Sequence, residues 1–188
     1  MIENLYKDVN NPDLLKACDT IVRLFDGSLN KMDLTDSITR VMDPKELIQN
    51  HQIKKSEKLF KELNLELKSW MIFLQGPERE QIIHADGNSE TRENLSNWAL
   101  NIPLENCENS IMKWYGGEHL LKLIKSKTDD VNYLKIEWKE NPYIIGTKNI
   151  TGPTIVNIEV PHRVKNFLNK TRKILSVRFK TDESLMAI

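Results

Sequence analysis

From Leu65 to Lys180 the chain breaks into short runs of β-branched, aromatic and aliphatic residues, with glycine or proline between many of them. Short runs with such punctuation predict an all-β barrel or sandwich. The strongest turn signals are Gly76-Pro77, Gly116-Gly117, Asn141-Pro142 and Gly152-Pro153. We expect strands in LELKSWMIFLQ, REQIIHAD, SNWALNIPL, IMKWY, VNYLKIEW, PYIIGTKNI, TIVNIEV and TRKILSVRF, whereas HLLKLIKSK fits a helix as well as a strand.

The first 64 residues have a helical pattern instead. Apolar residues recur at helical spacing between Asn11, which can cap a helix, and Gly27, which suits its end. A second short helix is expected from Asp43 and a third over residues 56–64, with His51 in a loop between them. We therefore predict a helical extension, residues 1–64, that packs on a β core, residues 65–188, within a single structural domain.

Composition limits the function classes. With 188 residues, 39% hydrophobic and 29% charged, the chain suits one soluble globular domain. A formal net charge of +0 disfavours nonspecific nucleic-acid binding, although a local basic groove stays open. Two cysteines, Cys18 and Cys107, suggest no disulfide framework, and from the residue pattern we expect neither a signal peptide nor a membrane-spanning run. We expect a cytoplasmic protein that does not bind membranes; its oligomeric state is open.

Three ligand-type residues stand out in the strand-like runs. His84 and Asp86 are two positions apart in REQIIHAD, and such residues point the same way in a strand. His162 comes much later, and on alternation it would end the apolar row that starts at Val156, at the mouth of a barrel. Two imidazoles and one carboxylate can bind a metal ion from one side. They form the ligand set of non-haem Fe(II) oxygenases.

The order His84-Ala85-Asp86, then His162, then Arg172 ten positions later resembles the Fe(II)/2-oxoglutarate-dependent oxygenase superfamily. Its members have a double-stranded β-helix, or jelly-roll, fold. The resemblance implies Fe(II) held by the two histidines and the aspartate, 2-oxoglutarate as cosubstrate, and Arg172 as the partner of the distal carboxylate. It also implies a hydroxylase-type reaction on a small-molecule or peptide substrate that the sequence does not identify.

Further cosubstrate ligands are expected on the same strands. On alternation, Arg172, Ile174, Ser176 and Arg178 share one face of TRKILSVRF. Two arginines six positions apart resemble the AlkB-type nucleic-acid demethylases, in which both contact the cosubstrate, but Ile174 stands where that branch has asparagine. Ser176 and Arg178 are therefore further candidates, with the alternative that Arg178 reaches water at the strand end.

Asn101 is a polar residue inside the apolar run SNWALNIPL. It either faces the cosubstrate or faces solvent, because alternation does not say which face of a strand is the core. The lysines of the last runs, Lys165, Lys170, Lys173 and Lys180, are interpreted as a solvated face. Asn101 is the only one of these residues that we count as a candidate cosubstrate ligand.

Two other functions stay open. One is a cupin-like metalloenzyme that binds the metal with the same three residues but does not use 2-oxoglutarate. In that case Arg172 would stabilise the structure or bind the substrate. The other is a non-catalytic jelly-roll binding or structural module in which the motif is vestigial or accidental. Metal analysis combined with 2-oxoglutarate turnover would separate the three.

Overall fold

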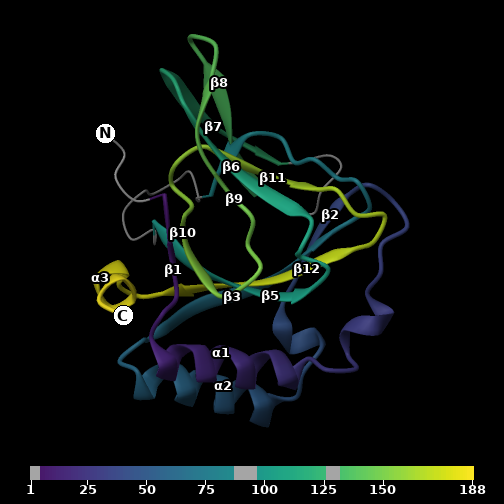
Figure 1. Cartoon of the computed structure of the whole chain (residues 1–188), viewed down its shortest axis with the longest axis vertical. Helices are drawn as coiled ribbons and strands as arrows, with labels where there is room; N and C mark the ends of the chain where they lie inside the picture. The colour runs from purple at the N-terminus through teal and green to yellow at the C-terminus, as the bar shows by residue number, and fades with distance from the viewer. Residues whose placement is uncertain (1–4, 87–96, 126–131) are drawn as a thin grey trace.

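The computed structural model describes residues 5–86, 97–125 and 132–188. Two six-stranded antiparallel sheets face each other, and two helices cover the outer face of one of them (Figure 1). We call the helix-covered sheet sheet A and the other sheet B. The metal-ligand candidates come from sheet B and the predicted cosubstrate ligands from sheet A, so the interface between the sheets decides the site.

Sheet A has the strand order β1-β10-β5-β12-β3-β2 and sheet B the order β7-β8-β4-β11-β6-β9. From β3 to β6, and again from β10 to β12, successive strands alternate between the sheets, which is the winding of a jelly roll. The predicted fold, mainly β with N-terminal helices, is therefore confirmed. It differs from a closed barrel, since each sheet ends in edge strands. The strands are β1 (Tyr6–Asp8), β2 (Thr39–Met42), β3 (Leu67–Gln75), β4 (His84–Ala85), β5 (Trp98–Glu105), β6 (Ser110–Gly116), β7 (His119–Lys125), β8 (Asn132–Trp138), β9 (Tyr143–Lys148), β10 (Thr154–Asn157), β11 (His162–Asn166) and β12 (Arg172–Phe179).

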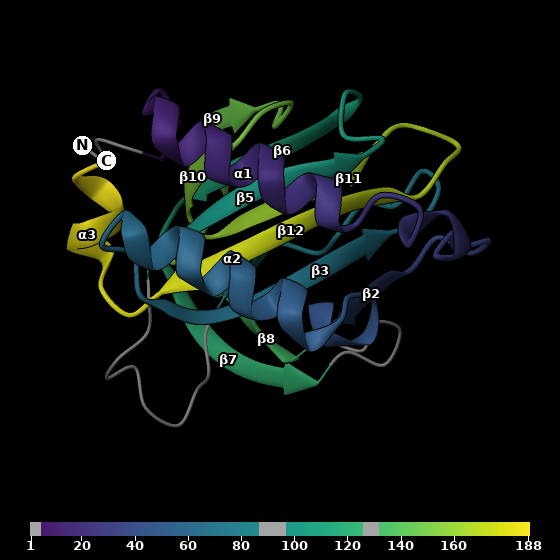
Figure 2. The same cartoon turned by 90° about the horizontal axis from the view of Figure 1, so that it is seen from below.

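Two α-helices, α1 (Pro12–Leu24) and α2 (Asn50–Glu62), lie side by side across the outer face of sheet A (Figure 2). Two short 3-10 helices, η1 (Leu29–Lys31) and η2 (Pro44–Glu46), connect them to the sheet, and α3 (Asp182–Met186) follows β12. The third predicted helix begins at Asn50, so His51 belongs to α2 rather than to a loop. The segment 1–64 also supplies β1 and β2, whose three and four residues are too few for a clear periodic signal.

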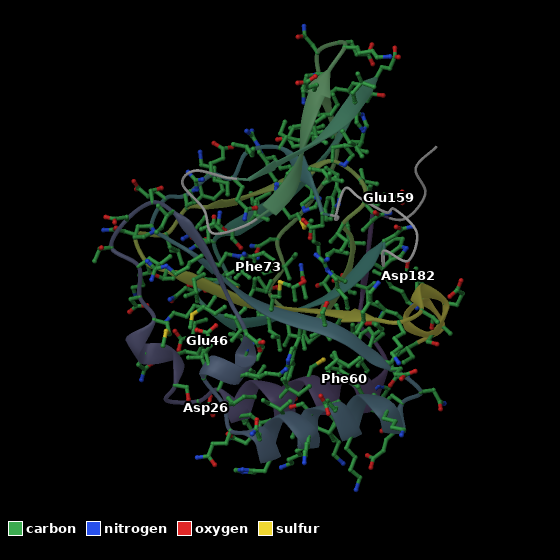
Figure 3. The ribbon with its side chains drawn as sticks, turned by 180° about the vertical axis from the view of Figure 1, so that it is seen from behind. Asp26, Glu46, Phe60, Phe73, Glu159 and Asp182 are labelled. Carbon is green, nitrogen blue, oxygen red and sulfur yellow. The ribbon has the colours of Figure 1, made fainter. Side chains whose placement is uncertain are left out.

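The hydrophobic core has one layer on each face of sheet A. Between the sheet and the helices, Phe60 of α2 packs edge-on against Phe179, with 5.1 Å between ring centroids. Phe73 lies on the opposite face, between the two sheets (Figure 3). Residues 172–177 of β12 are all buried, because helices cover one side of this strand and sheet B covers the other.

The described residues include no helix with the length and apolar composition needed to cross a membrane. Cys18 lies in α1 within the helix-facing core, and Cys107 lies in the turn between β5 and β6. Both thiols are buried and unbridged. In the ambiguous run HLLKLIKSK, residues 119–125 form β7, which pairs with β8 along its whole length, and the last two residues lie outside the described part of the chain.

The start of α1 gives a first testable prediction. The side-chain oxygen of Asn11 accepts hydrogen bonds from the backbone N–H groups of Asp13 and Leu14, both at 3.0 Å. Because Asn11→Ala leaves these two donors without a protein partner, we expect the free energy of unfolding to fall by about 1 kcal/mol in urea denaturation. The neighbouring exposed Asn10→Ala should change it by less than about 0.5 kcal/mol. Equal losses in the two variants would contradict the capping role.

Candidate metal centre

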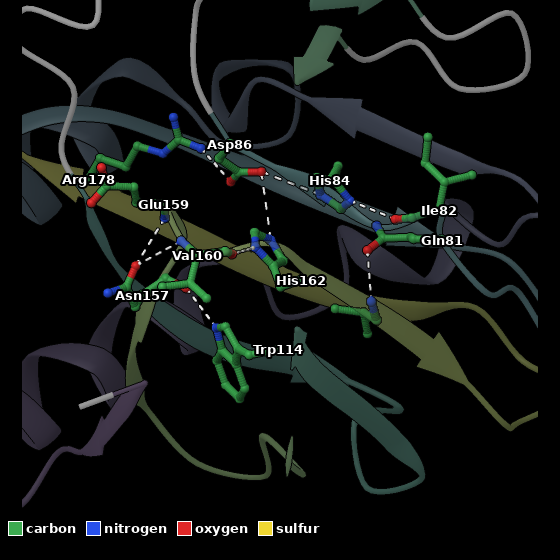
Figure 4. A network of polar contacts seen from close by, with 11 residues as sticks. Gln81, Ile82, His84, Asp86, Trp114, Asn157, Glu159, Val160, His162 and Arg178 are labelled. Carbon is green, nitrogen blue, oxygen red and sulfur yellow. Dashed lines mark hydrogen bonds and ion pairs between the residues drawn. The ribbon is translucent and has the colours of Figure 1, made fainter. Parts of the chain in front are cut away.

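His84 of β4 and His162 of β11 are directly opposite each other in the register of sheet B. Their rings lie 4.6 Å apart between centroids. Asp86 follows β4, and its Oδ1 lies 3.4 Å from Nε2 of His84 and 3.8 Å from Nε2 of His162 (Figure 4). The candidate ligand atoms of the three residues all lie within 4.8 Å of one another. The fold therefore brings together the three residues that the motif selects.

The backbone sets the tautomer of both imidazoles. Nδ1 of His84 lies 2.9 Å from the carbonyl oxygen of Ile82, and Nδ1 of His162 lies 2.9 Å from that of Val160. A carbonyl oxygen only accepts, so each Nδ1 carries a proton, and Nε2 is the nitrogen that faces Asp86 and is available to a metal ion. Metal-bound histidines have this arrangement, with one nitrogen on the metal and the other donating to a carbonyl.

Asp86 is held from its other side by Arg178, whose guanidinium donates to Oδ2 at 2.8 Å. Burial by itself raises the pKa of Asp86, but the hydrogen bond with His84 and the charge of Arg178 hold it well below its ordinary value. Burial, together with the neighbouring His84, lowers the pKa of His162 to about 4. At neutral pH the carboxylate is thus ionised and His162 is neutral, as metal binding requires.

His162 reaches the centre by a route that differs from the predicted one. The side-chain oxygen of Asn157 accepts from the backbone N–H groups of Glu159 and Val160 at 3.1 and 3.2 Å, and Trp114 donates to the Asn157 carbonyl at 2.8 Å (Figure 4). This turn ends β10 and carries the chain from sheet A to sheet B. The predicted strand is therefore interrupted between Asn157 and His162. Val156, Ile158 and Val160 still belong to one core cluster between the sheets, and His162 lines the cavity, as the predicted inward row implies.

The strand predicted for REQIIHAD is also shorter than expected, since only His84 and Ala85 form ladder pairs in β4. The backbone N–H of Asp86 donates to the carbonyl oxygen of Ile158 at 3.0 Å, which supports the chain beyond the strand. His84 and Asp86 consequently keep the same-side arrangement that the i, i+2 spacing predicts.

A cavity lies between the sheets, with about 440 Å³ of empty space including its open mouth. Asn101 and Ser176 are cross-strand neighbours of sheet A and face this cavity, whereas Leu100 and Ile102 face the helices. Of the two orientations left open for Asn101, the side chain thus has the one that faces the cavity and not solvent. Its Oδ1 is buried and has no hydrogen-bond partner among the described residues. The cavity is lined by both kinds of candidate, which are His84, Asp86, His162, Asn101, Arg172 and Ser176.

Arg172 borders the cavity as a buried cation, only 3% exposed. Its Nε donates to the Ser110 hydroxyl at 3.0 Å and its NH1 to Gln75 Oε1 at 3.5 Å. Burial lowers the pKa of Arg172, yet a guanidinium keeps its charge in proteins. No carboxylate in the described part of the chain pairs with it, and an unpaired buried charge is costly. The cavity therefore favours an anionic ligand at Arg172.

Of the seven site residues predicted from the sequence, six line the cavity and Arg178 is not among the described lining residues. Arg178 differs from Arg172, because its guanidinium binds Asp86 rather than facing the cavity or only water. Gln75 and Ser110, which contact Arg172, were not expected from the sequence. Gln75 is a polar residue that ends an apolar run just before a turn signal, but only the packing of the two sheets gives it a partner.

No protein-family model matches this chain, and no curated protein does. Among solved structures, it is similar to the non-haem α-ketoglutarate-dependent carbocyclase SnoK from nogalamycin biosynthesis, with a TM-score of 0.51 and 12% identity over 94% of this chain and 80% of that chain. A prolyl-4-hydroxylase from Pseudomonas putida has a TM-score of 0.45 and 12% identity, covering 93% and 90% of the two chains. An oxalate decarboxylase mutant from Bacillus subtilis has a TM-score of 0.33 and 11% identity, covering 82% and 29%.

The match to the carbocyclase shows a shared fold. This shared fold agrees with the resemblance drawn from the His-x-Asp, His and Arg motif. The His-Asp-His cluster is compatible with a metal site that has two histidine ligands and one carboxylate ligand. The chain therefore has the jelly-roll fold found in Fe(II)/2-oxoglutarate-dependent oxygenases, with a compatible His-Asp-His cluster on the wall of its cavity.

Proposed function

We propose that this protein is an Fe(II)/2-oxoglutarate-dependent oxygenase of the hydroxylase type, with a small-molecule or peptide substrate. One observation carries the proposal: a single cavity is lined both by three convergent metal-ligand candidates and by a buried arginine that lacks a carboxylate partner among the described residues. The first feature fits a divalent metal and the second fits an anion. A dicarboxylate with a keto group next to one carboxylate can satisfy both at once.

Nε2 of His84, Nε2 of His162 and Oδ1 of Asp86 would hold Fe(II), since this donor set suits that ion and leaves positions open. Bound Fe(II) would supply the activation of O2 that is coupled to 2-oxoglutarate decarboxylation. Arg178 holds Oδ2 of Asp86, so that one carboxylate oxygen stays directed at the histidines. The ionised aspartate needs no proton transfer before it binds the metal.

Arg172 would bind the distal carboxylate through charge-assisted hydrogen bonds, for which a guanidinium is the suitable group. Asn101 and Ser176, side by side on the cavity wall, offer an amide and a hydroxyl to the cosubstrate. Because the two sheets bury these groups, the contacts would form away from bulk water, where electrostatic interactions are stronger.

The test is anaerobic reconstitution with Fe(II), followed by titration with 2-oxoglutarate. We expect the weak metal-to-ligand charge-transfer band that appears when 2-oxoglutarate chelates Fe(II). Arg172→Ala should raise the dissociation constant by about 100-fold, because it removes the charge partner of one carboxylate. Arg163→Ala is the matched control, since the Arg163 guanidinium pairs with Glu80 at 3.0 Å and does not line the cavity.

The outcomes separate the three functions. Stoichiometric metal binding without the charge-transfer band would refute the oxygenase and favour a metalloenzyme that does not use 2-oxoglutarate. A folded protein that binds no metal would favour the non-catalytic binding or structural module. An Arg172→Ala variant that binds 2-oxoglutarate as tightly as the wild type would refute the role of Arg172.

A further inference from the structure

Two buried polar side chains contact Arg172 from opposite sheets. Gln75, 0% exposed, ends β3 and is the cross-strand partner of Arg172 in sheet A. Ser110, 1% exposed, begins β6 in sheet B. Neither has a place in the metal centre. Their burial next to Arg172 indicates that they act on its guanidinium.

The amide of Gln75 can have only one orientation. Its Nε2 lies 2.9 Å from the carbonyl oxygen of Arg79 and 3.0 Å from that of Val164. Both of these groups only accept, so the NH2 end must face them and the Oε1 end must face Arg172. The backbone of two separate segments therefore holds a neutral acceptor against the guanidinium.

The Ser110 hydroxyl is oriented in the same way. Oγ lies 2.8 Å from the carbonyl oxygen of Cys107, to which it donates its only proton. Its lone pairs are left for Nε of Arg172 at 3.0 Å. Since Nε and NH1 of Arg172 are engaged by these two oxygens, the rotation of the guanidinium is restricted from both sheets.

The Gln75 and Ser110 oxygens that contact Arg172 belong to uncharged side chains, so the cavity keeps the positive charge of Arg172. An aspartate or glutamate in either place would pair with Arg172 and cancel its charge before a ligand arrives. With an amide and a hydroxyl instead, the guanidinium is hydrogen-bonded but keeps its full charge. Arg172 has five N–H donors. Ser110 and Gln75 engage two of them and the buried Cys107 side chain also hydrogen-bonds the guanidinium, so donors remain for a carboxylate in the cavity.

We propose that Gln75 and Ser110 are positioning residues that orient the Arg172 guanidinium without neutralising it, and that the neutrality of Gln75 makes the site selective for a dicarboxylate keto acid. This inference rests on the proposed function and deepens it. Gln75 acts through Arg172, and it is not among the described residues that line the metal-centre cavity. Its replacement should therefore change how the distal carboxylate is bound and not how the keto acid group is bound.

The experiment compares two keto acids on the Fe(II)-loaded, oxygen-free protein by titrating the charge-transfer band. 2-Oxoglutarate has the distal carboxylate, and 2-oxobutyrate lacks it. Gln75→Leu, which removes the acceptor, should raise the dissociation constant for 2-oxoglutarate about 10-fold. Gln75→Glu, which introduces a competing carboxylate of the same shape, should raise it about 100-fold. Both variants should bind 2-oxobutyrate within about 3-fold of the wild type.

Gln81→Leu is the matched control, because Gln81 lines the same cavity and accepts from the backbone N–H of Val164 at 3.2 Å, whereas the Arg172 hydrogen bonds described above go to other residues. It should raise both dissociation constants by a similar factor, with no preference for the dicarboxylate. If Gln75 variants do not fold, Ser110→Ala provides the second measurement, with an expected rise of about 10-fold for 2-oxoglutarate only.

Equal changes for both keto acids, or a wild-type constant for 2-oxoglutarate in the Gln75 variants, would overturn the inference. If Arg172→Ala at the same time no longer binds 2-oxoglutarate, the proposed function is supported. Only the positioning role of Gln75 and Ser110 is then refuted. If the wild type itself does not bind 2-oxoglutarate, the proposed function fails and this inference fails with it.

Discussion

Replacing His162 with alanine is expected to lower the affinity for Fe(II) by roughly 1000-fold, because one of three ligands is lost and each ligand of a site contributes a few kcal/mol. His162 is 4% exposed, and its position opposite His84 is set by the register of β4 and β11. A water molecule cannot replace the imidazole at equal affinity, since it lacks the fixed lone pair that the Val160 carbonyl orients. Metal content after dialysis against a known free Fe(II) concentration measures the loss.

The matched control is His119→Ala. His119 in β7 has the same local contact as the two ligands, with Nδ1 2.8 Å from the carbonyl oxygen two residues before it, that of Gly117. Its ring lies against Trp138 and is not part of the His-Asp-His cluster. We expect His119→Ala to keep full metal content. A His162→Ala protein with wild-type metal content would show that the three residues do not form the metal site.

The second large effect is expected at Lys173. Its ammonium donates to the carbonyl oxygen of Leu29 and to Glu105, both at 2.7 Å, and lies 2.8 Å from Asp33. The side chain is only 1% exposed. Lys173→Met keeps the hydrophobic stem but removes the charge that these acceptors share. We expect the free energy of unfolding to fall by about 3 kcal/mol, and the melting temperature by roughly 6–12 °C.

Urea denaturation and thermal melting measure this effect. The exposed Lys170→Met, three residues earlier, should change the free energy of unfolding by less than about 0.5 kcal/mol. Lys173→Met should leave metal affinity unchanged, since Lys173 binds η1 and does not line the metal-centre cavity. A variant as stable as the wild type would show that the buried ion pairs contribute no net stability.

Lys173 also corrects the sequence interpretation, in which it belonged to a solvated face. Lys180, which pairs with Glu66, and Lys165, whose Nζ lies 3.5 Å from Glu80, remain at the surface. Lys173 is different because β12 is one of the two central strands of sheet A and is covered on both sides. Alternation assigns residues to two faces, but it does not tell that both faces are buried.

Local chemistry made much of this protein predictable. The cap at Asn11 and the helical spacing after it are interactions within a few residues, and α1 lies where they place it. The i, i+2 spacing of His84 and Asp86 is also local, and the two side chains share a side as expected. Turn signals marked most of the strands for the same reason.

The tertiary structure decided which of these local features meet. His162 lies opposite His84 because a turn at Asn157 moves the chain between sheets, and no local pattern encodes that register. Asn101 faces the cavity because helices occupy the other side of β5. The sequence by itself determined the types and order of the candidate ligands and the β-rich fold. Only the packing of the sheets determined the site, because contacts between distant segments depend on strand pairing and on which faces are covered.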